Sequence, residues 1–484
     1  MSEQGTIDIA GKPVHFIGVG GIGMSALAYI LARCGLPVSG SDLRQSHITQ
    51  RLEASGVRIF RTQAATNLEH FDGQLPQVVC STAIGPDNPE YRAAVTMGCP
   101  IFHRSDVLAS LIAARSQSVA VAGTHGKTTT SSLIGYLLLE GGLDPTIVVG
   151  GEVDAWDGNA RQGESEILVA EADESDGTLT KLRSAVGVIT NIELDHPDHY
   201  DSLDAVVEIF TTFGDRCQTI VGCWDCPTVR ERLHCDLSYS LDPSSGADYI
   251  ARDIVYSSNG TEAQVLEGGR ILGVMQLPML GKHNLSNALA AIAVARHCGL
   301  KWEAIARGLA GFGGAKRRFE YRGQSNGIVC IDDYAHHPSE ITATLEAARL
   351  RVTRPGPFST LAAANGNGVS ASARRVVAIF QPHRYTRVAT FLEEFSTAFA
   401  AADVAIVTDV YAAGEPANGI TSQQLVDAIR RHHGEVHHHQ DLSTLPDFLT
   451  QVLEPGDLAM FLGAGNLNQT IAPTLDLLGA RCAA

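Results

Sequence analysis

The sequence is poor in positive charge and lacks long apolar runs. Its 484 residues include 36 Lys and Arg against 53 Asp and Glu, which leaves a net charge of −17. A protein that binds the nucleic-acid backbone needs basic surface to displace counterions, so we expect no nucleic-acid partner. No run of about 18 apolar residues occurs, so we expect no membrane span and no membrane partner.

Cysteine is also scarce. The 10 cysteines include a single CxxC pair, Cys223 and Cys226, without the second pair that a zinc ribbon requires. The first residues lack a basic segment followed by an apolar core, so we expect no secretory signal. Scattered thiols and the missing signal together predict a reducing, cytoplasmic location.

Three segments repeat one order of elements: an apolar run, a turn and then a helical pattern. They run from Val14 to Gly35, from Ser118 to Gly142 and from Val376 to Val410. Apolar runs without strict alternation, each followed by a helix, are typical of parallel strands buried on both faces. A chain of this length also exceeds a single hydrophobic core. The sequence therefore predicts an α/β protein of three domains, at residues 1–115, 116–318 and 319–484.

One segment of low complexity interrupts the third domain. It extends from Arg354 to Arg375 and is rich in Gly, Ala, Ser and Asn. It lies between a predicted helix and a predicted strand, where a loop of about 2–6 residues would suffice. We interpret it as a mobile surface insertion and assign it no function.

A glycine-rich turn follows the first apolar run. Gly18, Gly20 and Gly23 match the pattern G-x-G-x-x-G, and a further predicted strand ends at Asp42. Glycines at these positions let backbone amides approach a diphosphate at a helix N-terminus, and Asp42 is placed to meet a ribose-like hydroxyl. The pattern leaves three interpretations open: a nicotinamide dinucleotide, another diphosphate ligand such as a UDP-sugar, or a bare structural turn.

The second apolar run leads into GTHGKTT, residues Gly123 to Thr129, which matches the end of a P-loop. Val121 stands where the full Walker pattern has glycine. The remaining pattern still places successive N–H groups before a helix. Lys127 can reach terminal phosphates, and the Thr128 hydroxyl can bind Mg²⁺. We therefore expect a phosphate site at this turn.

Acidic residues follow the next two predicted strands. Glu171 ends an apolar run, and a strand that delivers a carboxylate beside a phosphate loop supplies a hard oxygen ligand for Mg²⁺. The later strand is followed by Asn191, Glu193, Asp195 and His196. Imidazole is a common metal ligand, so His196 is a candidate for a second metal.

Seven motifs follow the N-terminal glycine turn, and the resemblance that they carry runs over nearly the whole chain, from about Val14 to Gln469. Together they resemble the Mur ligases, the ATP-dependent amide ligases of peptidoglycan precursor assembly. The motifs are GTHGKTTT, EADESD, TNIELDH, HNLSNA, RRFE, DDYAHHPSE and PHRYTR. In this family the N-terminal domain binds a UDP-sugar, so the resemblance implies that ligand for the first glycine turn.

The resemblance implies a fold and a reaction. The expected fold has an N-terminal Rossmann-like UDP-sugar domain, a central P-loop ATPase-like domain and a C-terminal Rossmann-like domain. The implied cofactors are ATP and Mg²⁺, and the implied partners are UDP-N-acetylmuramate and L-alanine, bound by a monomer or homodimer. ATP would phosphorylate the lactyl carboxylate of the sugar, and the amine of L-alanine would then attack the acyl phosphate.

The resemblance also assigns roles to the residues that match its motifs. The implied catalytic residues are Lys127, His196, Arg318 and His336. The implied ATP-binding residues are Gly123, Thr124, His125, Gly126, Lys127, Thr128, Thr129, Asn284, Asn287, Arg318 and Asp333. The implied UDP-sugar residues are Gly18, Gly20, Gly21, Ile22, Gly23, Ser41 and Asp42. The implied amino-acid pocket is Tyr334, His336, Arg384 and Arg387, and the implied metal ligands are Thr128, Glu171 and His196.

One departure and several alternatives accompany this interpretation. Several Mur ligases hold a second metal with a carbamylated lysine, but no lysine occurs here between Lys181 and Lys282, so a neighbouring acid or water must replace it. Within the family, the alternative is the recycling ligase that joins a tripeptide to the same sugar. Outside it, the alternatives are an NAD-dependent dehydrogenase built on the first turn and a non-catalytic nucleotide switch.

Overall fold

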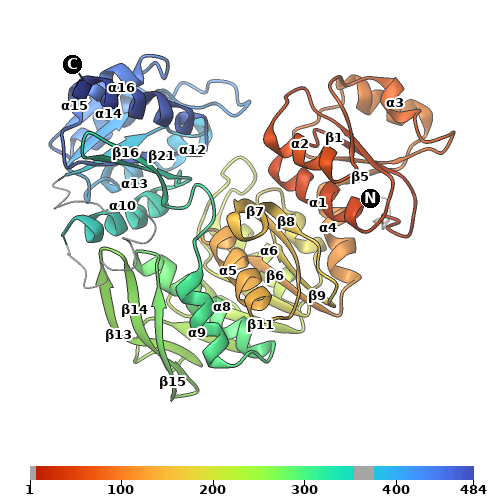
Figure 1. The fold of residues 1–484 in the computed structure, drawn as a ribbon, viewed down its shortest axis with the longest axis horizontal. Helices are drawn as coiled ribbons and strands as arrows, with labels where there is room; N and C mark the ends of the chain where they lie inside the picture. The colour runs from red at the N-terminus through yellow and green to blue at the C-terminus, as the bar shows by residue number, and fades with distance from the viewer. Residues whose placement is uncertain (1–6, 354–374, 484) are drawn as a thin grey trace.

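The computed structural model describes residues 7–353 and 375–483. These residues form three lobes, each built around its own β-sheet (Figure 1). The insertion predicted at 354–375 lies outside the described residues except for Arg375.

The N-terminal lobe has a five-stranded parallel sheet with the strand order β3-β2-β1-β4-β5. All four residues of β1 are buried, because this apolar strand lies in the middle of the sheet. The strands are β1 (Val14–Ile17), β2 (Val38–Ser41), β3 (Arg58–Phe60), β4 (Gln77–Cys80) and β5 (Ile101–His103). The helices are α1 (Ile22–Arg33), α2 (His47–Ala54), α3 (Pro89–Met97) and α4 (Arg104–Ala113).

The central lobe has a ten-stranded sheet with the order β15-β14-β13-β12-β11-β10-β6-β9-β7-β8. Its middle strands are parallel, whereas β13, β14 and β15 form an antiparallel extension. The strands are β6 (Gln117–Ala122), β7 (Thr146–Val153), β8 (Gly158–Arg161), β9 (Ile167–Glu171), β10 (Val186–Ile189), β11 (Thr219–Cys223), β12 (Leu237–Ser240), β13 (Tyr249–Ser257), β14 (Gly260–Glu267) and β15 (Arg270–Leu277). The helices are α5 (Lys127–Glu140), α6 (Leu203–Gly214), α7 (Pro227–Arg232), α8 (Lys282–His297) and α9 (Trp302–Gly311).

The C-terminal lobe has a six-stranded sheet with the order β16-β17-β21-β18-β19-β20, in which β16 is antiparallel to its neighbour and the other pairs are parallel. The strands are β16 (Glu320–Ser325), β17 (Ile328–Asp333), β18 (Val376–Phe380), β19 (Val404–Val407), β20 (Val436–His438) and β21 (Leu458–Leu462). The helices are α10 (Pro338–Thr353), α12 (Tyr385–Thr390), α13 (Leu392–Thr397), α14 (Ser422–Arg430), α15 (Leu445–Val452) and α16 (Ile471–Ala483).

The predicted α/β class with three domains is confirmed, and the strands at the centre of each sheet are parallel. The three repeated segments correspond to β1 with α1, β6 with α5, and β18 with α12. The boundaries expected at residues 115 and 318 stay predictions; they lie in the connections between α4 and β6 and between α9 and β16. The sequence analysis did not foresee the antiparallel extension β13–β15.

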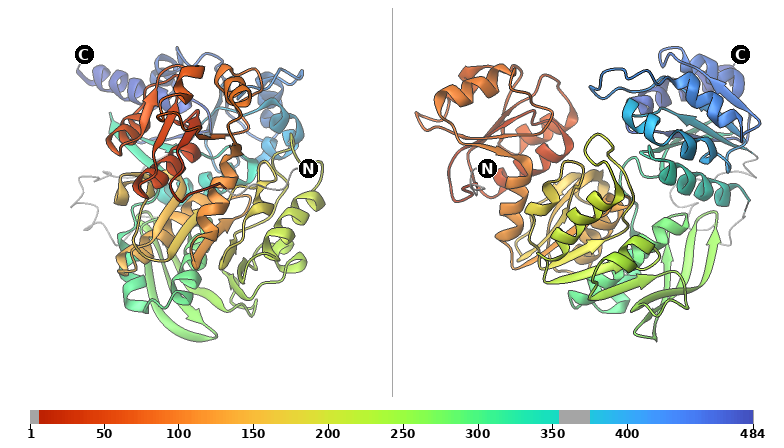
Figure 2. Two further views of the ribbon diagram at one scale, coloured as in Figure 1. Left: turned by 90° about the vertical axis from the view of Figure 1, so that its right-hand side faces the viewer. Right: turned by 180° about the vertical axis from the view of Figure 1, so that it is seen from behind.

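Side chains join the N-terminal lobe to the central lobe. The Asn159 amide donates to the Ser25 hydroxyl over 3.0 Å, and the Arg51 guanidinium donates to the Ala160 carbonyl over 3.0 Å. Lys181 forms an ion pair of 2.7 Å with Asp106. Figure 2 shows the N-terminal and C-terminal lobes on either side of the central one. The loops at the carboxyl ends of the parallel strands, where α/β folds bind ligands, are therefore held between lobes.

Candidate active site

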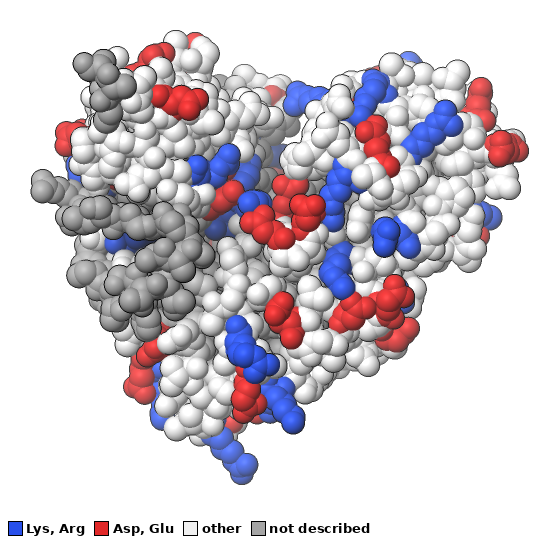
Figure 3. Space-filling view, in the orientation of Figure 1, with Lys and Arg blue, Asp and Glu red and all other residues white. Residues whose placement is uncertain are grey.

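A cavity of about 980 Å³ lies where the three lobes meet. The N-terminal lobe contributes Ile22 and Gly23 to its lining, the central lobe Lys127, and the C-terminal lobe Tyr334 and Arg384. In the space-filling view, acidic and basic side chains gather between the lobes (Figure 3). A cavity of this size accommodates organic ligands and brings together groups that are far apart in the sequence.

The second glycine turn, between β6 and α5, has a tightly fixed backbone. Gly126 has φ +82°, and a Cβ there would lie 2.5 Å from Asn287 Oδ1. The N–H of His125 donates to Asn191 Oδ1 over 2.8 Å, and the Thr190 hydroxyl donates to the His125 carbonyl over 2.6 Å. The turn therefore leads into the N-terminus of α5, where unpaired N–H groups attract anions.

Lys127 is the first residue of α5 and lies at this turn. Its ammonium donates to the carbonyls of Gly123, over 2.6 Å, and Thr124, over 3.1 Å. It also lies 2.9 Å from a carboxylate oxygen of Glu174. Although burial opposes the charge, Glu174 and Asp173 raise the pKa of Lys127. Lys127 is thus held as a cation beside the cavity.

Thr128 and Glu171 form a hard oxygen site beside Lys127. The Thr128 hydroxyl donates to Glu171 Oε1 over 3.1 Å, and the Gly150 N–H donates to Glu171 Oε2 over 2.7 Å. Burial raises the pKa of Glu171 above its usual value, and Lys127 opposes the shift. A hydroxyl and a carboxylate are ligands that Mg²⁺ prefers, so these two residues fit the expected metal.

His196, the candidate ligand for a second metal, lies between two carboxylates. Its Nε2 is 3.7 Å from Glu174 Oε1 and 3.7 Å from Asp195 Oδ2. His196 has φ +55°, a strained conformation for a residue other than glycine. The structure thus places two acids, Glu174 and Asp195, beside His196, near the start of the stretch between Lys181 and Lys282 that contains no lysine.

The two arginines of the expected amino-acid pocket are both paired with acids of the central lobe. Arg387 is 2 % exposed, and its Nε and Nη2 lie 3.0 and 2.9 Å from Asp195 Oδ1. Arg384 Nη1 lies 2.6 Å from Asp198 Oδ2. Both arginines line the cavity, and their ion pairs connect the C-terminal lobe to the loop after β10.

Aromatic and imidazole rings form the C-terminal wall of the cavity. The Tyr334 and His336 rings lie 5.4 Å apart, and the His336 and His383 rings 5.7 Å apart. The Arg318 guanidinium lies 5.2 Å from the centre of the Tyr334 ring. Burial and the neighbouring His336 lower the pKa of His383 to about 3, so His383 is neutral. His383 was missed by the sequence analysis, although it directly precedes Arg384 in PHRYTR.

Five of the expected ATP-binding residues do not line the described cavity. Asn284 donates to the Leu280 carbonyl over 2.7 Å, and Asn287 lies against Gly126. Asp333 accepts from the N–H groups of Phe319, over 2.7 Å, and Ala335, over 2.8 Å, and burial raises its pKa to about 6. Neither asparagine nor Asp333 lines the described cavity, and the same holds for Gly123 and Thr129.

The first glycine turn, between β1 and α1, is held by its own acid. The Gly20 N–H donates to Asp42 Oδ2 over 2.9 Å, so Asp42 supports the turn. The Ser41 hydroxyl donates to the buried Glu90 and faces the interior of the lobe. Of the seven expected UDP-sugar residues, Ile22 and Gly23 line the described cavity, whereas Gly18, Gly20, Gly21, Ser41 and Asp42 do not.

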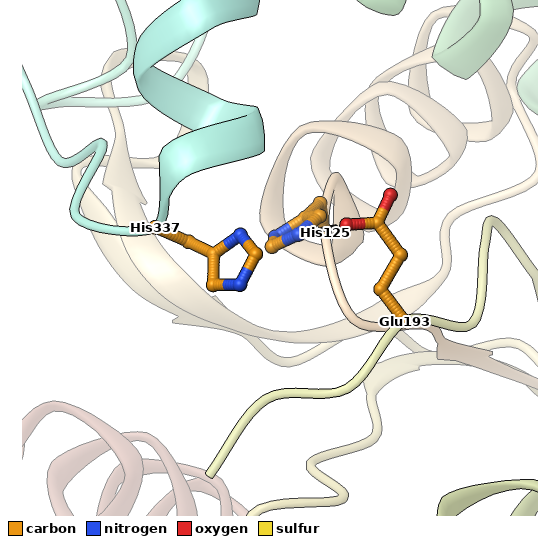
Figure 4. A group of neighbouring side chains, drawn as sticks. All are labelled: His125, Glu193 and His337. Carbon is orange, nitrogen blue, oxygen red and sulfur yellow. Dashed lines mark ion pairs between the residues drawn. The ribbon is translucent and has the colours of Figure 1, made fainter. Parts of the chain in front are cut away.

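His125 extends from the second glycine turn toward the C-terminal lobe. Its Nε2 lies 3.4 Å from Glu193 Oε2 and its Nδ1 lies 3.3 Å from Glu340 Oε1. The ring of His337 lies 4.8 Å away (Figure 4). Although burial opposes the charge, the two carboxylates raise the pKa of His125 to about 10. His125 is therefore an imidazolium that bridges acids of two lobes.

Several residues of this region were missed by the sequence analysis as members of the site. They are Glu174, Asp195, Glu340 and His383, each of which lies against an expected site residue.

In the part of the chain that the structure describes, no helix is both long and apolar enough to cross a membrane.

Three family models match the chain in sequence. The model of the Mur ligase family catalytic domain matches residues 13–116, and that of the Mur ligase middle domain matches residues 121–295. The model described as the Mur ligase glutamate ligase domain matches residues 317–465. Together they cover most of the 484 residues.

Curated relatives and solved structures agree with these matches. The UDP-N-acetylmuramate–L-alanine ligase of Gloeothece citriformis is 56% identical, over 96% of this chain and 98% of its own. The enzyme of the same name from Microcystis aeruginosa is also 56% identical, over 99% and 98%. The crystal structure of MurC, the UDP-N-acetylmuramate–alanine ligase of Thermotoga maritima, has a TM-score of 0.80 and 26% identity over 97% of this chain and 99% of its own. This chain therefore belongs to the Mur ligase family.

Proposed function

We propose that this protein is an ATP-dependent ligase that joins L-alanine to the lactyl carboxylate of UDP-N-acetylmuramate. One observation carries this choice of substrates: relatives that bear the name of this activity are 56% identical over almost the full length of both chains. Such a reaction adds the first amino acid to a peptidoglycan precursor. The cavity supports it because groups from three lobes meet there.

The recycling ligase that accepts a tripeptide is the alternative within the family. The structure of a murein peptide ligase from Psychrobacter arcticus has a TM-score of 0.70 and 22% identity over 97% of this chain and 99% of its own. That likeness concerns the fold alone, whereas the curated relatives match in sequence at more than twice that identity. L-Alanine is therefore the acceptor in the proposal.

The proposed reaction begins with activation of the carboxylate, because a carboxylate oxygen is a poor leaving group. The lactyl carboxylate attacks the γ-phosphorus of ATP, ADP leaves, and an acyl phosphate forms. Lys127 stabilises the charge that develops on the transferred phosphoryl group, since its ammonium is already held beside the turn. Arg318, which lies over Tyr334, adds a second cation from the connection between α9 and β16.

Metal binding belongs to the proposal. Thr128 and Glu171 would hold one Mg²⁺, and His196 with the neighbouring Glu174 would hold a second. When bound, Mg²⁺ screens the phosphate charges and polarises the phosphoryl oxygens.

The amide bond forms in the second half of the reaction. Tyr334, His336, Arg384 and Arg387 form the pocket for the amino acid, and a guanidinium fork suits its carboxylate. Closure of the lobes excludes water, which would hydrolyse the acyl phosphate. We further propose that the protein acts in the cytoplasm as a monomer or homodimer, with neither a membrane nor a nucleic acid as a partner.

Isotope transfer tests the proposed function directly. UDP-N-acetylmuramate labelled with ¹⁸O in its lactyl carboxylate is incubated with the protein, ATP, Mg²⁺ and L-alanine. The proposal expects one labelled oxygen in the released phosphate and dependence of phosphate release on L-alanine. Unlabelled phosphate would contradict the acyl phosphate, and a preference for the tripeptide over L-alanine would support the recycling ligase instead.

A further inference from the structure

Glu340, in the first turn of α10, contacts both the second glycine turn, through His125, and the expected amino-acid pocket, through His336. Its Oε1 lies 3.3 Å from His125 Nδ1. Its Oε2 accepts from the N–H groups of His336, over 3.0 Å, and His337, over 3.3 Å, and lies 3.1 Å from His336 Nδ1. One carboxylate thus touches the side chains of two residues that are 211 positions apart in the sequence.

These contacts determine which nitrogen of His336 carries the proton. His336 Nδ1 lies 2.9 Å from the Tyr334 carbonyl and 3.1 Å from Glu340 Oε2. Both neighbours are acceptors, so Nδ1 must be a donor and carries hydrogen. Nε2 is then the basic nitrogen of the neutral ring. It has no hydrogen-bond partner among the described residues, on a side chain that lines the cavity.

Glu340 itself is firmly held in its charged form. His125 and His336 lower the pKa of Glu340 well below its usual value, even though burial opposes the charge. His125 is fixed in turn by Glu193, which accepts a hydrogen bond of 2.7 Å from the Ser339 hydroxyl. One oxygen of the Glu340 carboxylate therefore contacts His125 of the second glycine turn, and the other oxygen contacts His336.

We propose that Glu340 is a positioning residue that fixes the Nδ1–H tautomer of His336 and so makes His336 Nε2 the base for the incoming amine. This inference rests on the proposed function and adds to it how the base is oriented. A buried carboxylate that orients an imidazole in this way also stabilises the imidazolium that forms when the ring accepts a proton.

The step that this arrangement serves is the attack on the acyl phosphate. The ammonium of L-alanine gives a proton to His336 Nε2, and the freed electron pair forms a bond to the carbonyl carbon. The bond between that carbon and the phosphate oxygen breaks, and the phosphate leaves with the electron pair. The second N–H proton passes to the departing phosphate. The products are the amide, hydrogen phosphate and a protonated His336.

The variant Glu340→Gln tests the proposal with little change in shape. The amide oxygen can still accept from the N–H groups at the start of α10, so the helix keeps its cap. The charge is lost: the amide oxygen in the place of Oε2 accepts more weakly from the Nδ1–H of His336, and it no longer stabilises the imidazolium that forms when Nε2 takes a proton. We expect kcat for amide formation to fall about 10²-fold at pH 7, with the KM for L-alanine unchanged. Glu346→Gln is the matched control, because Glu346 lies on the same helix and is exposed.

Two further measurements separate this role from a purely structural one. Hydroxylamine is a neutral amine near pH 7 and needs no base, so Glu340→Gln should form the hydroxamate at the wild-type rate. The deficit with L-alanine should also shrink as the pH rises and the free amine becomes abundant. Equal losses with both amines, or a deficit independent of pH, would overturn the proposal.

Other titratable and charged groups around His336 also affect how the activity depends on pH. Besides Glu340 they are Tyr334, Asp195 and His383, and Arg387 lies beside His383, 3.3 Å from its Nδ1. These groups are the same in the variant and in the wild type, so the ratio of the two pH profiles isolates the effect of Glu340.

If the wild type released no phosphate with L-alanine, the proposed function would fail. If the wild type were active and Glu340→Gln equalled it, only this inference would fail.

Discussion

The two glycine turns have the same backbone plan and different side-chain chemistry. Each follows a buried parallel strand, β1 or β6, and leads into a helix, α1 or α5. The first turn is held by a carboxylate, since the Gly20 N–H donates to Asp42. The second is held by a cation, since Lys127 donates to two carbonyls of its own turn.

The residues around the two turns also differ in charge. The first helical turn of α1 begins with Ile22 and Gly23 and carries no charged group, whereas α5 begins with Lys127 and Thr128. His125 also ties the second turn to the C-terminal lobe. A glycine turn before a helix therefore provides an anion site, but the side chains around it decide whether that site only binds or also stabilises a transferred charge.

Lys127→Ala should have the largest effect on activity, because it removes the cation that distinguishes the second glycine turn from the first. We expect the rate of L-alanine-dependent phosphate release to fall roughly 10³-fold. Steady-state phosphate release in the presence of UDP-N-acetylmuramate measures it. Lys301→Ala removes an exposed lysine before α9 and serves as the control. A rate within a few-fold of wild type would contradict the role of Lys127.

Asp42→Ala tests the first turn in the corresponding way. The Gly20 N–H loses a charged acceptor, so the turn loses its fixed shape. Hydrogen bonds to charged groups contribute about 1.5–3 kcal/mol, so we expect the KM for UDP-N-acetylmuramate to rise about 10- to 100-fold. The KM for ATP should not change. Asp87→Ala, at an exposed position of the same lobe, is the control. A rise in the KM for ATP instead would show that the two turns do not act separately.

A pair of glycine substitutions sharpens the comparison further. In Gly126→Ala the new Cβ meets Asn287, and φ +82° is strained for alanine, so we expect the KM for ATP to rise roughly tenfold. In Gly20→Ala the Cβ would lie 2.7 Å from Asp42 Oδ2, so the KM for UDP-N-acetylmuramate should rise instead. Measuring both constants for both variants tests whether each turn serves its own ligand. Equal effects on both constants would contradict that assignment.

The smallest expected effect concerns pH. The carboxylates around His125 raise its pKa to about 10, so their stabilising contribution is complete below pH 6.5 and is lost as the pH rises through 10. Between pH 7 and pH 10 the Tm of the wild type should therefore fall roughly 2–4 °C further than that of His125→Asn. His234→Asn, which changes an exposed histidine of the same lobe, should follow the wild type. Parallel curves for His125→Asn and the wild type would exclude the imidazolium bridge. The first turn carries no such group, so this test applies to the second alone.

Local patterns identified the elements and many of the site residues. Lys127 and Thr128 follow a glycine turn directly, and Glu171 ends a buried strand, so local patterns were enough to predict the contact that the structure shows between Thr128 and Glu171. The antiparallel extension β13–β15 was not foreseen, because partly exposed strands give a weaker pattern than buried parallel ones. The sequence also carried no sign that the Asp42 and Ser41 side chains bond to the protein itself, to the Gly20 N–H and to Glu90.

By itself, the sequence determined the three α/β domains and the two glycine turns, and it predicted a phosphate site at the second, because strands, turns and helices arise from residues close together in the chain. The tertiary structure alone decided that Arg387 pairs with Asp195 and His125 with Glu340, across 192 and 215 residues. A local pattern carries no information on which distant carboxylate will be buried beside a given cation. That choice is made when the lobes pack, because a buried charge must then find a partner.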